Sequence, residues 1–161
     1  MLTKPDADSR KKVDLSSLWT LTGFNLRMLD VRMMRTVSEQ LARIELSPAS
    51  VTVLLVLDSN PGLSHGKLAD ALLVQRPNMT KLVNRLVAKR LVRRDAALGD
   101  KRQVELALTE AGRRLAVKAR GVLHDHDEAL LAALKPAERK QLLHLATRML
   151  AGLEGRDKNG A

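Results

Sequence analysis

The chain contains no cysteine and no tyrosine, and its 161 residues include only one tryptophan and one phenylalanine. Without cysteine, neither a disulfide bond nor a thiol-based redox switch can form. So few aromatic residues offer little for the core of a β-sandwich, whereas the abundant leucine, valine and alanine suit packed helices. The composition therefore favours a helical protein.

Long apolar runs are also missing. The most apolar segment, VTVLLVL at residues 51–57, is far shorter than the roughly 20 residues of a membrane-spanning helix. The first residues, MLTKPDADSRKK, lack the apolar core of a signal peptide. We therefore expect a soluble, cytoplasmic protein that does not enter a membrane.

No set of catalytic residues emerges from the sequence. There is no glycine-rich phosphate loop, no nucleophile elbow and no paired His–Glu metal motif. Ser64 and His65 are neighbours, but a helix-capping role accounts for Ser64 without catalysis. We expect neither an enzyme nor a cofactor.

What the chain does have is positive charge, +10 formally, with a sequence pI of about 10.5. Nucleic acid is the first partner that such a charge predicts, and an anionic membrane surface is the second. The length fits one domain, or one domain with an extension.

The charge is densest in residues 76–94, which carry seven lysines and arginines and no acidic residue. At helical spacing, the apolar residues of the first part share one face, namely Met79, Leu82, Val83 and Leu86. The opposite face holds Pro77, Lys81, Asn84 and Arg85, with Asn78 and Thr80 at its edges. Such side chains can read adenine, guanine and thymine in the major groove. A solvated basic face is the alternative, and a hairpin downstream favours the DNA interpretation.

Short capping and turn motifs divide the rest of the chain. A helical pattern covers residues 15–44, with a break or bend near Gly23. Ser47-Pro48 begins a helix that ends near Ser59, and Ser64 caps a helix over 66–73. A short turn at 74–76 then leads to the basic helix, as in a helix-turn-helix motif.

The second half of the chain reads as a hairpin followed by two helices. We predict strands at 91–95 and 103–108 around a turn at 96–101. Thr109 caps a helix that reaches about residue 134, where Lys135-Pro136 breaks it. The last helix then covers 137–153, and a frayed tail follows.

Residues 15–44 have more apolar positions than one buried stripe needs, so they must be covered on more than one side, most simply by a second subunit. The same segment holds a mixture of aromatic, basic and flexible side chains that can line an effector pocket: Trp19, Phe24, Arg27, Met28, Val31, Arg32 and Arg35. A dimer core with a basic rim explains these residues equally well, and both interpretations stay open.

Metal-binding residue types follow one another at His124-Asp125-His126-Asp127-Glu128, but their spacing does not suit a metal site. Positions two apart on a helix point to different sides, so only His124 with Asp127 or Glu128 can share a face, which is a poor spacing for a metal ion. We expect a solvated helix face and no metal.

Together these residues resemble the MarR family of winged-helix regulators. The most specific part is Asp100-Lys101-Arg102, followed after five residues by Leu108-Thr109-Glu110-Ala111-Gly112. The resemblance implies a mainly α fold with a small two- or three-stranded β-wing. It also implies dimerisation regions at 14–46 and 109–153 and a winged helix-turn-helix domain at 47–108. The polar residues at 1–13 predict a mobile segment, and those at 154–161 predict a tail.

The resemblance further implies how DNA is bound. The basic helix would enter the major groove, Arg102 the adjacent minor groove, and Asp100 would hold that arginine or shape the tip of the wing. The implied DNA contacts are Ser64, Arg76, Pro77, Asn78, Thr80, Lys81, Asn84, Arg85, Arg94, Asp100, Lys101 and Arg102. A homodimer would place two such heads on a pseudo-palindromic operator.

Many members of the family leave DNA when a small organic ligand binds, and the segment TGFNLRMLDVRMM resembles a subgroup whose ligands include aromatic acids and their coenzyme A thioesters. The expected function is therefore a repressor relieved by such an effector. Two alternatives remain: a non-specific architectural DNA-binding protein, which explains the charge equally well, and an interaction or membrane-surface protein.

The chain departs from the family pattern at two turns, where glycines are common but this sequence has Leu73 and Arg90. A left-handed backbone at a non-glycine residue costs about 1 kcal/mol, so either the turns are reshaped or that cost is tolerated.

Overall fold

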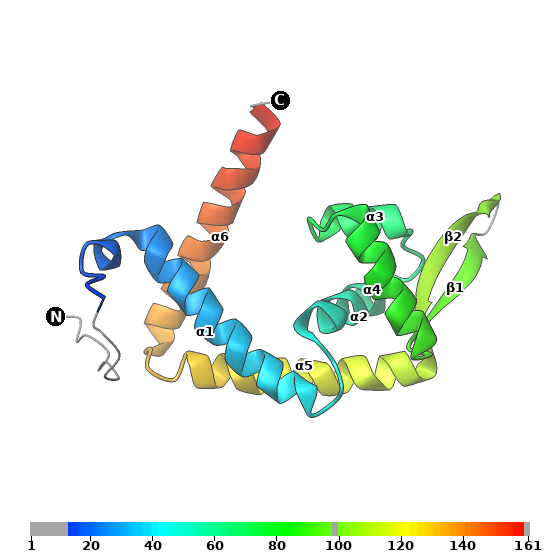
Figure 1. The fold of residues 1–161 in the computed structure, drawn as a ribbon, viewed down its shortest axis with the longest axis horizontal. Coiled ribbons are helices and arrows are strands. Elements are labelled where there is room, and N and C mark those ends of the chain that lie inside the picture. The colour runs from blue at the N-terminus through cyan, green and yellow to red at the C-terminus, as the bar shows by residue number, and fades with distance from the viewer. Residues whose placement is uncertain (1–12, 98–99, 160–161) are drawn as a thin grey trace. The chain divides into compact units, whose positions relative to one another are not determined.

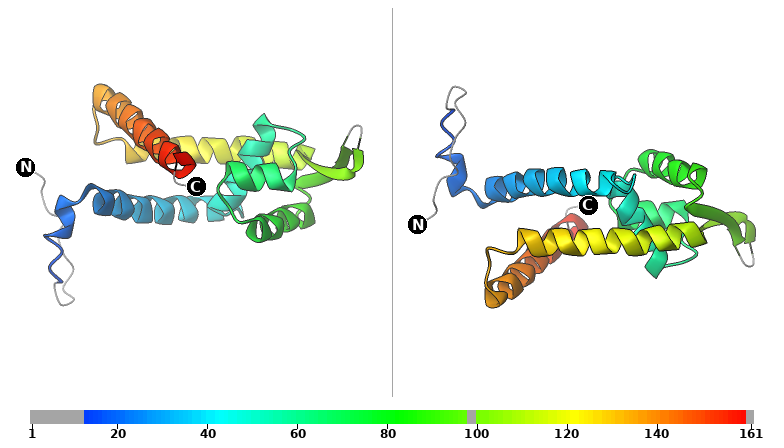
Figure 2. Two further views of the ribbon diagram at one scale, coloured as in Figure 1. Left: turned by 90° about the horizontal axis from the view of Figure 1, so that it is seen from above. Right: turned by 90° about the horizontal axis from the view of Figure 1, so that it is seen from below.

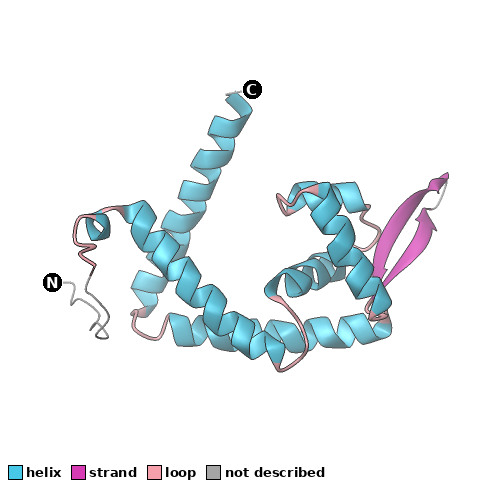
Figure 3. Ribbon diagram, viewed as in Figure 1, coloured by secondary structure: helices cyan, strands magenta, loops and turns pink. Residues whose placement is uncertain are grey.

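The computed structural model describes residues 13–97 and 100–159, and the side chains within 13–96 and 104–153. The described backbone forms two compact units, with the boundary between residues 36 and 37. Helices make up most of the described chain, with one hairpin (Figure 3). The mainly α fold with a small wing, predicted from the sequence, is confirmed.

The first unit begins with a short 3-10 helix, η1 (Leu18–Thr20), and continues into α1 (Thr22–Ala42), which crosses into the second unit. The predicted helix over 15–44 is interrupted at Leu21, whose backbone is extended, two residues before Gly23, near which the break was expected. The side-chain amide of Asn25 stabilises this break, because it donates to the carbonyls of Trp19 at 2.9 Å and Leu21 at 2.8 Å.

Two of the predicted caps begin the next helices. The Ser47 hydroxyl accepts a hydrogen bond from the Ser50 amide at the start of α2 (Pro48–Ser59). The Ser64 hydroxyl does the same for the Lys67 amide at the start of α3 (His65–Ala71). Both caps are confirmed, although α3 ends two residues before the predicted Leu73.

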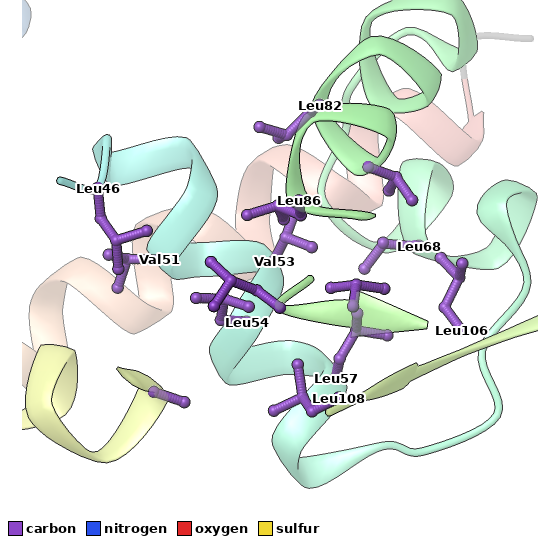
Figure 4. Close-up of a cluster of buried hydrophobic side chains, with 14 of the residues drawn as sticks. Leu46, Val51, Val53, Leu54, Leu57, Leu68, Leu82, Leu86, Leu106 and Leu108 are labelled. Carbon is purple, nitrogen blue, oxygen red and sulfur yellow. The ribbon is translucent and has the colours of Figure 1, made fainter. Parts of the chain in front are cut away.

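The predicted phase of the basic helix, α4 (Arg76–Ala88), is confirmed by its burial. Its apolar face is the buried one and contributes Met79, Leu82, Val83 and Leu86. These side chains pack with leucines and valines of α2, α3 and the hairpin in one core (Figure 4). Because the core covers the apolar face, the polar face of α4 is exposed.

The hairpin consists of β1 (Val92–Ala97) and β2 (Asp100–Leu108), which lie side by side in both views of Figure 2. The strands are antiparallel, and the register runs from Val92 opposite Leu108 to Ala96 opposite Val104. They reach further than predicted, so the turn is shorter than 96–101. The peptide before α3 adds a single bridge, with the Leu106 amide 2.9 Å from the Leu63 carbonyl.

The last two helices are α5 (Glu110–Leu130) and α6 (Pro136–Asn159). Thr109 caps α5 as predicted, but α5 ends before residue 134, since residues 131–134 form turns ahead of Pro136. The predicted tail is wrong for residues 154–159, where α6 continues. The glycines there look like a stop, yet the neighbouring glutamate, arginine and lysine favour helix and no proline follows.

Three corners of the fold share one unusual backbone conformation. Among the described non-glycine residues, those with positive φ are Glu45 (56°), Leu73 (52°) and Arg90 (56°). At each corner, the next residue's amide bonds a carbonyl five positions back, as in a Schellman motif: Leu46 to Leu41, Val74 to Ala69 and Leu91 to Leu86. The family's glycine positions therefore keep their left-handed geometry, and the cost at Leu73 and Arg90 is tolerated.

Candidate nucleic-acid interface

The exposed face of α4 forms a continuous polar surface. Its central residues line one open hollow, namely Asn78, Lys81, Asn84 and Arg85. Pro77, Thr80 and Arg76 are also exposed, so every predicted contact on this helix faces solvent. In Figure 1, α4 lies between α3 and the hairpin, which are the parts of a winged helix-turn-helix.

Two side chains at the beginning of α4 are already engaged within the protein. The Thr80 hydroxyl donates to the Arg76 carbonyl at 3.0 Å, so its methyl group and its lone pairs remain for a ligand. The Arg76 guanidinium lies 3.7 Å from the Asp70 carboxylate of α3, and both side chains are largely exposed. Such a pair is weak, and a phosphate can displace Asp70.

Ser64 lies at the N-terminus of α3, where its hydroxyl oxygen accepts from the Lys67 amide at 3.3 Å. The residue is half-buried. Because the oxygen serves as the cap, the hydroxyl hydrogen is the part that can still be donated to a phosphate.

Arg94 links the hairpin to α4, because its guanidinium donates to the Asn84 amide oxygen. The charge of Arg94 also acts on His65, the first residue of α3. Burial, followed by the positive charge of Arg94, holds the pKa of His65 below its usual value of 6.5. Arg94 of the hairpin thus binds Asn84 of α4 and acts electrostatically on His65 of α3.

The predicted contacts at the tip of the wing are Asp100, Lys101 and Arg102. Their backbone belongs to β2, and their side chains lie outside the described residues. The roles of these three residues therefore stay predictions.

The candidate effector residues all belong to the first unit. Trp19 and Phe24 contact each other edge to face, with ring centroids 5.0 Å apart and an interplanar angle of 79°. Three- and four-residue spacings place the other candidates, together with Phe24, along one side of α1: Arg27, Met28, Val31, Arg32 and Arg35. Phe24 and Met28 are half-buried, and Arg27 and Arg32 are exposed.

Two further expectations concern metals and membranes. The side chains described by the structure contain no group of three potential ligands close enough to hold a metal ion, and His124 and Asp125 form only a 3.9 Å contact between exposed groups. Within the same residues, no helix is both long and apolar enough to cross a bilayer.

Three contacts at or near the site do not follow from the sequence. They are the bond between Arg94 and Asn84, the bond from the Lys89 ammonium to the Glu45 carbonyl at 2.9 Å, and the close approach of Gly112 to Leu91. Of these, only the contact between Gly112 and Leu91 has a signal in the sequence, namely the glycine that ends the Leu108–Gly112 motif.

The fold and this exposed basic helix define a winged helix-turn-helix DNA-binding protein. The model of the MarR family matches residues 44–103. A Thauera aromatica protein, named as a candidate transcriptional regulatory protein for the hcr operon, is 32% identical over 79% of this chain and 77% of its own length. The chain therefore belongs to the MarR family, and it is a DNA-binding transcriptional regulator.

Solved structures agree with this assignment. The transcriptional repressor CouR bound to a 23-mer DNA duplex matches with a TM-score of 0.81 and 28% identity, over 87% of this chain and 99% of that one. CouR bound to p-coumaroyl-CoA matches with a TM-score of 0.77 and 26% identity, over 86% and 98% of the two chains.

Proposed function

We propose that this protein is a homodimeric, sequence-specific repressor that a small organic effector, an aromatic acid or an acyl-CoA-like thioester, releases from its operator. The observation that carries the proposal is that one chain combines an exposed DNA-reading helix with an aromatic and arginine-bearing face on α1. The family and the relatives are transcriptional regulators, which supports a regulatory rather than an enzymatic role in the cytoplasm.

The dimer is supported by the apolar residues that α6 exposes. Over 136–153, Arg139 alone is half-buried and the other residues are exposed. They include Leu142, Leu143, Leu145, Met149, Leu150 and Leu153. So much exposed apolar surface on one helix indicates that α6 packs against another protein surface, and a second copy of the chain supplies that surface. Two copies place two reading heads on half-sites about one helical turn apart.

The domain boundaries predicted from the sequence are part of this proposal. Residues 47–108, which hold α2 to the end of β2, form the reading head. Residues 14–46 and 109–153, on either side of the reading head, form the dimer interface.

The effector class follows from the chemistry of α1. The edges and faces of Trp19 and Phe24 suit an aromatic ring, and the Met28 side chain adapts to irregular ligands. The guanidinium groups of Arg27 and Arg32 suit a carboxylate or a phosphate. CouR, which binds a thioester with both an aromatic acyl group and phosphates, supports the same ligand class.

Binding of the effector and binding of the operator must then weaken each other. If the effector binds better to a dimer whose heads no longer match the half-site spacing, it weakens DNA binding, and DNA weakens effector binding by the same factor.

The test is a titration of operator DNA with and without aromatic acids and their coenzyme A thioesters. We expect a ligand that weakens operator binding, and we expect Arg27→Met to reduce this response while leaving DNA affinity without ligand unchanged. Arg43→Met, which removes an exposed arginine beyond the end of α1, is the matched control. DNA binding that no such ligand weakens would contradict the effector part of the proposal.

Sequence specificity is tested separately. A repressor prefers its operator to unrelated duplexes at physiological salt, by typically about a thousandfold or more. Equal affinity for unrelated duplexes would instead identify a non-specific architectural DNA-binding protein.

A further inference from the structure

Arg94 lies on the inner face of the hairpin. Its partner across the sheet is Leu106, which is fully buried, so the Arg94 side chain starts on the face that covers the core. Side chains alternate along a strand, and Arg93 therefore lies on the outer face. There its guanidinium pairs with Asp95, also of β1, at 2.8 Å. The two adjacent arginines thus have different neighbours. Arg94 turns toward α4, whereas Arg93 pairs within β1.

The contact between Arg94 and Asn84 fixes the orientation of the asparagine amide. A guanidinium group has only donors, so it is the amide oxygen of Asn84 that must face Arg94. A hydrogen bond from a charged donor is stronger than a neutral one, and the oxygen is therefore held in place. The amide nitrogen, with its two hydrogens, is left for other partners.

This orientation changes what Asn84 can read. A free asparagine recognises adenine with both of its groups, since the oxygen accepts from N6 while the nitrogen donates to N7. Because the oxygen of Asn84 is turned toward Arg94, the end of the amide that stays unengaged is its nitrogen, which offers donors. Lys81 and Arg85, which line the same hollow, also offer only donors. In the major groove guanine presents two adjacent acceptors, N7 and O6, whereas adenine presents an acceptor beside a donor and cytosine a donor.

We propose that Arg94 determines base specificity through Asn84: it holds Asn84 as a hydrogen-bond donor, so that the polar face of α4 selects guanine over adenine at the base pair that Asn84 faces. This inference deepens the proposed function and rests on it, because it requires sequence-specific binding. Arg94 acts here as a positioning residue, since its effect on the base passes through Asn84.

The experiment is a selection from duplexes with a randomised half-site, carried out with the full-length protein and with Arg94→Met. Methionine keeps an apolar stem but has no donor. We expect the guanine preference at one position to fall by about fivefold or more, the smallest effect of losing one base-edge contact, and adenine to gain. Arg93→Met is the matched control, because it removes the same charge from the neighbouring residue. It should change the affinity for all sequences equally and leave the base preference unaltered.

Two further variants separate positioning from a merely structural effect. Arg94→Lys keeps a charged donor and should retain guanine preference. Adding Arg94→Met to Asn84→Ala should not alter base preference beyond the effect of Asn84→Ala alone. Unchanged preference in Arg94→Met, or an equal shift in Arg93→Met, would overturn the role of Arg94. A wild-type protein without any base preference would instead overturn the proposed sequence-specific function.

Discussion

The carbonyl oxygen of Leu91 lies so close to Gly112 that a Cβ atom on residue 112 would be 2.0 Å from it. The same carbonyl accepts hydrogen bonds from the Thr109 amide at 3.0 Å and from the Thr109 hydroxyl at 3.3 Å. That hydroxyl also donates to the Arg90 carbonyl at 2.8 Å and accepts from the Gly112 amide at 3.0 Å. The Thr109–Gly112 motif therefore joins the beginning of α5 to the beginning of the wing.

We predict that Gly112→Ala destabilises the protein by about 3 kcal/mol or more, because the neighbour is backbone and cannot rotate away. The measurement is chemical denaturation at equilibrium. Gly121→Ala is the control in the same helix: no atom lies within 4 Å of its added Cβ, so alanine should stabilise α5 by about 0.5–1 kcal/mol. Equal effects at the two positions would contradict the role of Gly112.

The left-handed corner at Leu73 predicts a stabilising substitution. Its side chain is 92% exposed, so Leu73→Gly removes no packing and relieves about 1–2 kcal/mol of backbone strain. Glycine also makes the unfolded chain more flexible, which offsets about 0.5–1 kcal/mol of that gain. We expect a net stabilisation of about 0.5–1 kcal/mol in equilibrium unfolding. Leu73→Ala keeps the strain and should leave stability nearly unchanged, and stabilisation by alanine as large as that by glycine would argue against strain.

His65 predicts a dependence of stability on pH. Its Nε2 atom is buried and has no hydrogen-bond partner among the described residues, and burial and Arg94 lower the pKa of the folded imidazole below 6.5. Well above pH 6.5 the imidazole is neutral in both the folded and the unfolded state and contributes no pH dependence. As the pH falls through 6.5, the unfolded state binds a proton first, so the free energy of unfolding decreases until the folded pKa is reached.

The measurement is the free energy of unfolding at pH 7.5 and at pH 5.5. His65→Gln should lose less stability between these values than the wild type, because glutamine does not titrate. Equal losses in the two proteins would show that other groups cause the pH dependence.

Lys81 predicts a change in the salt dependence of DNA binding. It is exposed on the polar face of α4, and we expect Lys81→Ala to weaken binding to all duplexes and to lower the slope of log affinity against log salt by about 1. Lys140→Ala changes the net charge equally, but on an exposed site of α6. The slope for Lys140→Ala should match the wild type, and a common change in both variants would indicate only an effect of net charge.

Features that depend on neighbouring residues could be predicted from the sequence. Ser47, Ser64 and Thr109 each cap a helix through an amide three residues later, so the signal lies within four residues. The phase of α4 was predictable as well, because its apolar and polar residues alternate with the helical period over three turns.

Contacts between distant residues could not be predicted in this way. The bond between Arg94 and Asn84 depends on how the hairpin packs against α4, and the sequence alone does not say which of two adjacent arginines turns inward. The end of α6 differs from the prediction for another reason. Glycine weakens a helix by only about 1 kcal/mol, so two glycines among good helix formers do not end it.

Lys89, the residue that follows α4, donates a hydrogen bond to the carbonyl oxygen of Glu45, 44 positions earlier in the sequence, in the corner that follows α1. A displacement of this corner therefore either breaks that bond or moves the final turn of α4 with it. At the end of the reading helix opposite Pro77, the ammonium group of Lys89 thus adds a polar link to the corner after α1 beside the apolar packing of the core.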